Sequence, residues 1–160
     1  CKERGYEYMG STDHAGQIPV AHGMSEPQLL KHVKKIQTLN DTVSDITILA
    51  GAEVNILPDG RIDVSDKTLS RLDYALASVH SHFTMNKEEM TERLIRAIQN
   101  PYVRILGHPT GRILKGRPGY IYDFEKVFDD LFRKFCILYC FKYIRFGLFV
   151  FTKTYRFISI

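Results

Sequence analysis

Strand-like and helix-like segments alternate along residues 1–131, and this alternation constrains the fold more than any other feature of the sequence. Short runs of apolar and β-branched residues favour strands, whereas apolar residues spaced by three or four favour helices. Such alternation is typical of parallel βα units and predicts an α/β fold. We expect strands at residues 6–10, 46–56, 73–80 and 102–106, and helices at 26–39, within 61–72, at 87–99 and at 124–131.

The second of these strands contains an unexpected carboxylate. The segment 46–60 begins as a β-branched apolar run, which suits a strand buried on both faces, and ends in the tight-turn sequence Pro58-Asp59-Gly60. Glu53 stands within this run where Leu or Val is expected. A buried carboxylate is costly unless it is paired or bound to a metal. Glu53 is therefore either a metal ligand or the partner of a buried Arg, and we favour the metal ligand.

Three histidines, His14, His80 and His108, occur at or shortly after the ends of the other strands. The carboxyl ends of parallel strands meet at one edge of a sheet, where the sites of such folds are built. Two imidazoles and one carboxylate suit Zn, Mn or Fe, so we expect Glu53, His80 and His108 to hold one ion. His14 can supply a second ion, with the two oxygens of Glu53 bridging the pair.

Three further residues are candidates for the same cleft, and two other histidines are not. Asp13 and His82 are expected to line the cleft. Arg112 lies in the loop after the fourth strand, where its guanidinium either holds an anion through two hydrogen bonds or remains on the surface. His22 and His32 are interpreted as surface or core residues. Phosphate-loop, serine-hydrolase and dinucleotide-binding motifs do not occur in the sequence.

The positive charge of the chain is concentrated at its end. The chain has 22 Lys and Arg against 18 Asp and Glu, but residues 131–160 hold six of these basic residues and no acid. The basic balance therefore gives little support for a nucleic-acid partner. Residues 131–160 are also rich in Phe and Tyr and break the βα pattern, so we expect the domain to span residues 1–130. The tail is interpreted as not native to the domain, rather than as a membrane or partner surface.

The cysteines and the termini give the expected compartment. Cys1, Cys136 and Cys140 make no disulfide framework, which is typical of a reducing compartment and predicts a cytoplasmic protein. Cys136 and Cys140 lack further Cys or His nearby, so we do not expect a metal site there. No apolar signal segment is visible, and Lys142 and Arg145 interrupt the tail too strongly for a membrane span.

Five segments of the chain are distinctive as strings: STDHA (11–15), GAEVNILPDG (51–60), LASVHSHF (76–83), MTERLIRAIQNP (90–101) and ILGHPTGR (105–112). Together they resemble a known family, the PHP (polymerase and histidinol phosphatase) domain, in the version at the C-terminus of bacterial and archaeal family X DNA polymerases. The resemblance covers roughly residues 1–130.

The resemblance implies a distorted (β/α)7 TIM-like barrel with up to three metal ions, Zn or Mn, at the strand ends. It implies metal-dependent phosphoesterase chemistry, which in the polymerase-linked members is a 3′–5′ exonuclease with related phosphatase activity on DNA ends. Its metal ligands match His14, Glu53, His80 and His108, with Glu53 bridging. Water held by the ions would be the nucleophile, and no separate catalytic side chain is assigned. The implied partners are DNA 3′ ends and an upstream polymerase domain in cis, in a DNA-repair role.

The sequence also departs from the family pattern. A first ligand motif, HxDxH with a later His, is expected before Cys1, and an Asp-x-His motif is expected after Asp130. Asn55 stands where related sequences commonly have Asp. We therefore expect a partial barrel with an atypical tail, and residues 1–160 to be poorly active or inactive although the longer parent is an enzyme. The alternatives are a stand-alone phosphatase acting on a small monoester such as histidinol phosphate, and a non-catalytic structural remnant.

Overall fold

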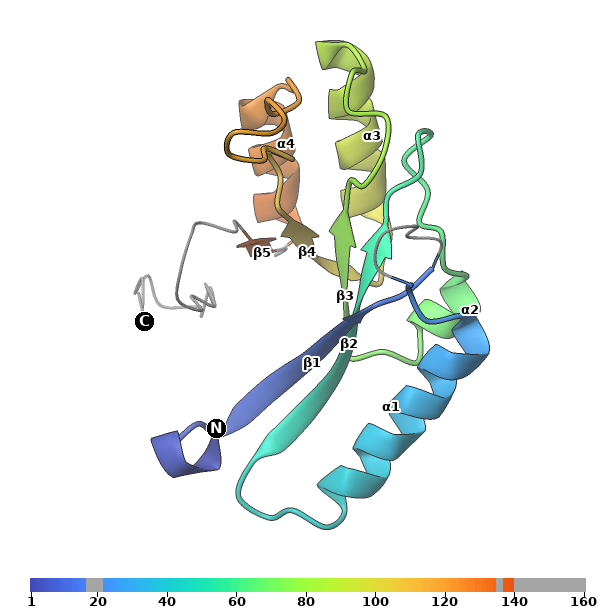
Figure 1. Cartoon of the computed structure of the whole chain (residues 1–160), viewed down its shortest axis with the longest axis vertical. Coiled ribbons are helices and arrows are strands. Elements are labelled where there is room, and N and C mark those ends of the chain that lie inside the picture. The colour runs from blue at the N-terminus through green and yellow to red at the C-terminus, as the bar shows by residue number, and fades with distance from the viewer. Residues whose placement is uncertain (17–21, 135–136, 140–160) are drawn as a thin grey trace.

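The strands pair in the order in which they occur in the chain. The computed structural model describes residues 1–16, 22–134 and 137–139, and within them five parallel strands form one sheet of order β1-β2-β3-β4-β5 (Figure 1). The strands are β1 (Tyr8–His14), β2 (Thr47–Asn55), β3 (Tyr74–Ser78), β4 (Val103–Gly107) and β5 (Ile137–Tyr139). The α/β class expected from the alternation is therefore confirmed.

A helix follows each of the first four strands, and a polar residue precedes each helix. These helices are α1 (Glu26–Asn40), α2 (Asp66–Leu69), α3 (Lys87–Gln99) and α4 (Phe124–Arg133), and a short 3₁₀ helix, η1 (Lys2–Arg4), precedes β1. At the start of α3, the Asn86 side chain accepts a hydrogen bond of 2.8 Å from the Glu89 amide. Ser65 and Asp123 accept equivalent bonds from the first turns of α2 and α4. Such caps satisfy amide groups that have no partner within the helix.

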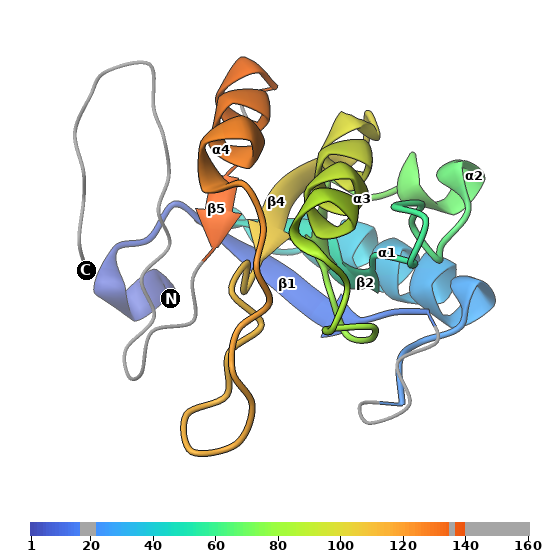
Figure 2. The same cartoon turned by 90° about the horizontal axis from the view of Figure 1, so that it is seen from above.

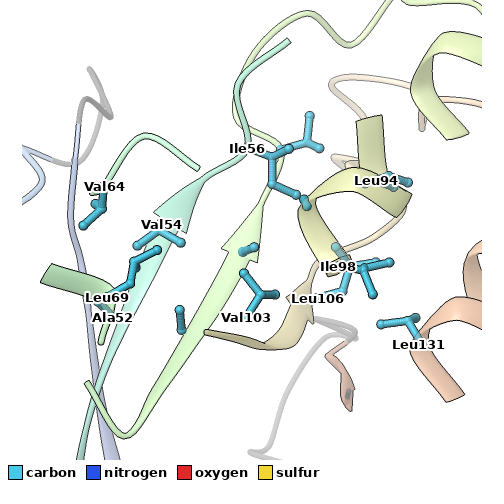
Figure 3. Close-up of a cluster of buried hydrophobic side chains, with 14 of the residues drawn as sticks. Ala52, Val54, Ile56, Val64, Leu69, Leu94, Ile98, Val103, Leu106 and Leu131 are labelled. Atoms are coloured by element: carbon cyan, nitrogen blue, oxygen red, sulfur yellow. The ribbon is translucent and has the colours of Figure 1, made fainter. Parts of the chain in front are cut away.

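The helices and the main core lie on one face of the sheet. Crossovers between neighbouring parallel strands are right-handed, so a sheet wound in one direction collects its helices on one side. Figure 2 shows α3 and α4 on the same side of the strands. Side chains from β2, α3, β4 and α4 meet there, as Figure 3 shows for Val54, Leu94, Leu106 and Leu131, all at most 3% exposed. Burial of this apolar layer fixes which face of every strand looks away from the helices.

The opposite face of the sheet carries no described helix and holds the side chains that alternate with this core. Glu53 in β2 and Tyr74 in β3 lie on that face. The Tyr74 ring lies across Gly51 of the neighbouring strand, where an added Cβ would come within 2.2 Å of the ring. Its hydroxyl reaches the hydroxyl of Thr12 in β1. One aromatic side chain therefore spans three strands below the ends at which the polar residues gather.

Two of the expected boundaries differ from the structure. The first strand does not end at Gly10 but continues to His14, because β1 pairs with β2 from Tyr8 opposite Thr47 to His14 opposite Glu53. The backbone ladder thus extends through the polar sequence that we had placed after the strand. At the other end, α4 continues to Arg133 and β5 pairs with β4, so the sheet extends past residue 130. Residues 135–136 and 140–160, with Cys136 and Cys140, lie outside the described residues, and the assignment of the tail stays a prediction.

The sheet corresponds to part of a barrel. Chain-order parallel strands with helices on one face are the arrangement of TIM-like barrels. Within the described residues the sheet is open, with β1 and β5 at its edges, so the complete seven-stranded closure is not seen there. In the part of the chain that is described, no helix is long and apolar enough to cross a membrane.

Candidate metal centre

Four side chains converge at the carboxyl ends of the strands on the face opposite the helices. Glu53 and His14 are register partners in β2 and β1, so both side chains leave the same face of the sheet. His80 follows the end of β3 by two residues, and His108 directly follows β4. His108 has a φ of 26°, an uncommon conformation for a residue other than glycine. Such strained backbone is often found at functional sites and here turns the chain sharply at the strand end.

The carboxylate of Glu53 is the centre of this cluster. The Nε2 atoms of His108 and His80 lie 3.0 Å and 3.2 Å from its Oε1, and the Nε2 atom of His14 lies 3.6 Å from its Oε2. The side chain of Glu53 is 17% exposed, whereas that of His14 is 44% exposed. The two carboxylate oxygens thus face different imidazoles, and the cluster opens to solvent on the His14 side.

The ionised form of Glu53 is strongly favoured. Burial opposes ionisation, but the hydrogen bonds from His108 and His80, together with the charge of His108, outweigh it and hold the pKa of Glu53 well below its usual value. The carboxylate is therefore available as an anionic ligand at any pH near neutrality. It is also stable without a metal, because the imidazole N–H groups can donate to it.

The cluster fits a divalent metal ion. Donor atoms of His14, Glu53 and His80 all lie within 4.8 Å of one another. Ligands about 2.0–2.1 Å from one tetrahedral ion are separated by ~3.3 Å, which is close to the separations between the carboxylate and the imidazoles. In the described part of the chain, the buried atoms His80 Nδ1 and Asn55 Oδ1 have no hydrogen-bond partner. Imidazole and carboxylate donors suit Zn and Mn without distinguishing between them.

The other candidates lie elsewhere. Asp13 is on the opposite face of β1, where its Oδ2 is 3.3 Å from the Nε2 atom of His32. His82 is exposed and its Nδ1 is 3.1 Å from Ser81 Oγ, within its own turn. Arg112 is exposed in the loop after His108. Neither Asp13 nor His82 has a described contact with Glu53, and His32, which we had interpreted as having no special role, holds Asp13 in place.

One buried residue near the site was not predicted. Arg93 of α3 is 2% exposed and donates to the backbone carbonyls of Leu57 at 2.9 Å and Ser81 at 3.0 Å, and also to that of Ile56. These carbonyls belong to the segments that follow β2 and β3. Arg93 therefore fastens together the two connections that emerge beside Glu53 and His80. Its position on the inner side of a strongly amphipathic helix was the available signal, since the flanking Met90 and Leu94 are both fully buried.

The chain is similar to several curated proteins. It is 38% identical over 129 residues to the DNA polymerase/3′-5′ exonuclease PolX of Bacillus subtilis, a match that covers 81% of this chain and 23% of that protein. It is 32% identical over 130 residues to a probable phosphatase of Caldanaerobacter subterraneus, covering 79% and 46% of the two chains. With a probable phosphatase of Photobacterium profundum it shares 33% identity over 134 residues, covering 81% and 49%.

Each match covers only part of the relative. The chain spans less than half the length of each of these three relatives. No family model matches the chain. Two of these relatives are named as probable phosphatases and one as a DNA polymerase and 3′-5′ exonuclease.

Proposed function

We propose that this chain is a PHP-type phosphoesterase domain, a metal-dependent hydrolase, and that it is the 3′–5′ exonuclease module of a family X DNA polymerase. The observation that carries the proposal is the convergence of three imidazole Nε2 atoms, from three different strand ends, on one buried carboxylate. The similarity to PolX supports the polymerase context. The proposed partners are then DNA 3′ ends and a polymerase domain in cis, in a cytoplasmic DNA-repair protein.

The residues of the cluster have distinct tasks in this proposal. A divalent ion held there would supply Lewis-acid chemistry, which activates water and polarises a phosphoryl oxygen. Glu53 supplies the negative charge that attracts cations, and its two oxygens would allow it to hold two of them. His80 and His108 contribute neutral nitrogens beside Oε1, and His14 contributes one beside Oε2. Arg112, in the loop after His108, is proposed to contact the substrate phosphate.

Hydrolysis with Mn²⁺ tests the proposal. The chain is incubated with a 5′-labelled single-stranded oligonucleotide, with and without Mn²⁺, beside Glu53→Gln as the inactive variant and Glu125→Gln as a matched exposed-carboxylate control. Metal-dependent shortening from the 3′ end, lost only in Glu53→Gln, is the expected result. We predict slow turnover for residues 1–160, so brisk turnover would contradict that prediction while supporting the activity.

Counting metal ions tests the bridging role of Glu53. Glu53→Ala is expected to remove two ions together, whereas His80→Ala weakens the binding of one. Elemental analysis of the purified variants after equilibration with Zn²⁺ or Mn²⁺ measures this. Equal losses in the two variants would contradict the bridge.

A second candidate function is hydrolysis of a small phosphate monoester. The observation that favours it is that several similar proteins are named probable phosphatases. Comparing p-nitrophenyl phosphate with the oligonucleotide under identical metal conditions separates the two candidates. Hydrolysis of neither substrate at a metal-loaded centre would favour a third candidate, a structural remnant without catalysis.

A further inference from the structure

The connection between β4 and α4 contains a tight hairpin that the metal centre does not explain. The Ile113 amide donates to the Arg117 carbonyl at 2.9 Å, and the Gly116 amide donates to the Ile113 carbonyl at 3.1 Å. Lys115, at the turn, has a φ of 60°. We refer to residues 111–119 as the hairpin loop. It begins three residues after His108, so its base adjoins the turn that carries this histidine.

The base of the hairpin loop is fastened firmly. Arg117 donates two hydrogen bonds to the Gly111 carbonyl, of 3.1 Å and 2.8 Å, and its guanidinium carbon lies 3.3 Å from the centre of the Phe83 ring. The Phe83 ring in turn stacks on Tyr120, with ring centres 6.3 Å apart. Phe83 belongs to the turn that follows His80. The Gly111 amide donates to the His108 carbonyl at 2.9 Å, so the hairpin loop is tied to both of the turns that carry histidines. The Arg117 guanidinium is occupied by Gly111 and Phe83.

The outer part of the hairpin loop carries positive charge that the described structure leaves unused. Arg112 and Lys115 are exposed, and their side chains have no hydrogen bond or ion pair within the described residues. Residues 108–122 contain three basic residues and no acid. Ile113 is 53% exposed and Leu114 is 49% exposed, so apolar surface lies beside these charges. A surface hollow of about 550 Å³ runs along the loop and is lined by residues 112, 113 and 115–119.

The hairpin loop projects on the same side of the sheet as Glu53. Figure 2 shows the connection between β4 and α4 extending away from the sheet on the side opposite α3 and α4. The side chain of Glu53 leaves β2 on that side, because it alternates with Ala52 and Val54 of the core. A molecule held at the metal centre and extending outward therefore leaves the sheet on the side of the hairpin loop.

We infer that the hairpin loop binds the sugar-phosphate backbone of a single-stranded polynucleotide whose end lies at the metal centre. Arg112 and Lys115 contact successive phosphates, and Ile113 and Leu114 provide apolar contact for unstacked bases. The inference rests on the proposed function and adds to it the loop that holds the substrate strand. A small monoester would be held at the metal centre alone and would not require cationic side chains on a projecting loop. An anionic lipid surface would also match basic and apolar residues, but it does not account for their place beside the histidines.

Binding of a fluorescent oligothymidylate tests the inference. Its affinity for the full chain is measured by fluorescence anisotropy at several salt concentrations, in EDTA, so that the result does not depend on hydrolysis. The variant is Arg112→Gln/Lys115→Asn, because Asn tolerates the positive φ of position 115. The control is Lys34→Gln/Lys35→Gln, which removes the same charge from the exposed side of α1.

The expected result is roughly tenfold weaker binding by the loop variant at low salt, and a salt slope reduced by about 1.4, since each phosphate contact contributes ~0.7 for single strands. The control should bind as the wild type does. Both variants should keep wild-type Mn²⁺ affinity, which shows that the fold is intact. No binding by the wild type, equal weakening by both variants, or a preference for phosphatidylserine vesicles over the oligonucleotide would overturn the inference. Binding that depends on the loop without any metal-dependent hydrolysis would sink the proposed function and leave the inference standing.

Discussion

Two buried charges of opposite sign lie near the same edge of the sheet, and they are satisfied in different ways. Arg93 donates to backbone carbonyls of Ile56, Leu57 and Ser81, which are neutral and fixed. Glu53 faces imidazoles, whose nitrogens can donate a proton or bind a cation. The alternative that Glu53 pairs with a buried Arg is wrong, because the buried Arg bonds elsewhere. A charge held by fixed carbonyls stabilises the fold, whereas a charge held by histidines can exchange its partners for a metal.

The largest effect that we expect is on stability, from Arg93→Met. Removing the guanidinium leaves the carbonyls of Ile56 and Ser81 without their described donor, whereas the Leu57 carbonyl still accepts from the Gly60 amide. The free energy of unfolding should fall by about 3 kcal/mol. Urea denaturation in EDTA measures the loss. Arg93→Lys should recover part of it, since an ammonium can reach fewer carbonyls. A loss below about 1 kcal/mol would show that these hydrogen bonds do not hold the strand connections together.

The second prediction concerns Glu53, whose contribution should depend on metal. Wild-type protein should gain about 2.7 kcal/mol of unfolding free energy when Zn²⁺ or Mn²⁺ is raised to a hundred times its dissociation constant. Glu53→Gln should gain almost nothing, because the amide is neutral and a poor ligand. Thermal unfolding with the ion and with EDTA measures both. A Glu53→Gln variant that metal stabilises as much as wild type would exclude the carboxylate as a ligand.

The third prediction uses pH to separate the two charges. Imidazole nitrogens must be unprotonated to bind a metal, so metal affinity should fall by roughly tenfold or more between pH 8 and pH 6. Burial lowers the pKa of Arg93, but a guanidinium remains charged through this range. The stability lost in Arg93→Met should therefore be the same at both pH values. Titration calorimetry measures the metal affinity at each pH, and urea denaturation measures the stability lost in Arg93→Met. A metal affinity that does not change with pH would argue against histidine ligands.

The smallest expected effect comes from Asn86→Ala, which removes the cap of the helix that carries Arg93. The free energy of unfolding should fall by about 1 kcal/mol. Metal affinity should not change, because none of the four ligand candidates lies on α3. If Asn86→Ala weakened metal binding, stability and metal binding would be coupled through α3. The separation between Arg93, which stabilises the fold, and Glu53, which binds metal, would then not hold.

The sequence predicted most of the sheet and the convergence on Glu53 for one reason. Parallel strands align their carboxyl ends, so residues at strand ends meet even when they are far apart in the chain. Asp13 was misplaced because the first strand was expected to end at Gly10. Once β1 continues to His14, the two-residue alternation puts Asp13 and His14 on opposite faces.

The features that were missed depend on tertiary contacts. An Arg in a helix is usually solvated, and no local pattern shows that three carbonyls from two other connections will surround Arg93. Strand β5 follows α4 within a segment whose composition resembles no strand–helix unit, so only its pairing with β4 identifies it. The anchor formed by Phe83, Tyr120 and Arg117 likewise joins segments that the sequence keeps apart.

Because His14 pairs with Glu53, the metal centre also depends on the register of β1 against β2. A slip of β1 by one residue along β2 would turn His14 toward the opposite side and present Asp13 or Ala15 to the carboxylate. Metal uptake would then distinguish correctly aligned molecules from misaligned ones that have the same secondary-structure content. A bound ion would therefore favour the native register of β1, since only that register brings His14 into the set of ligands around it.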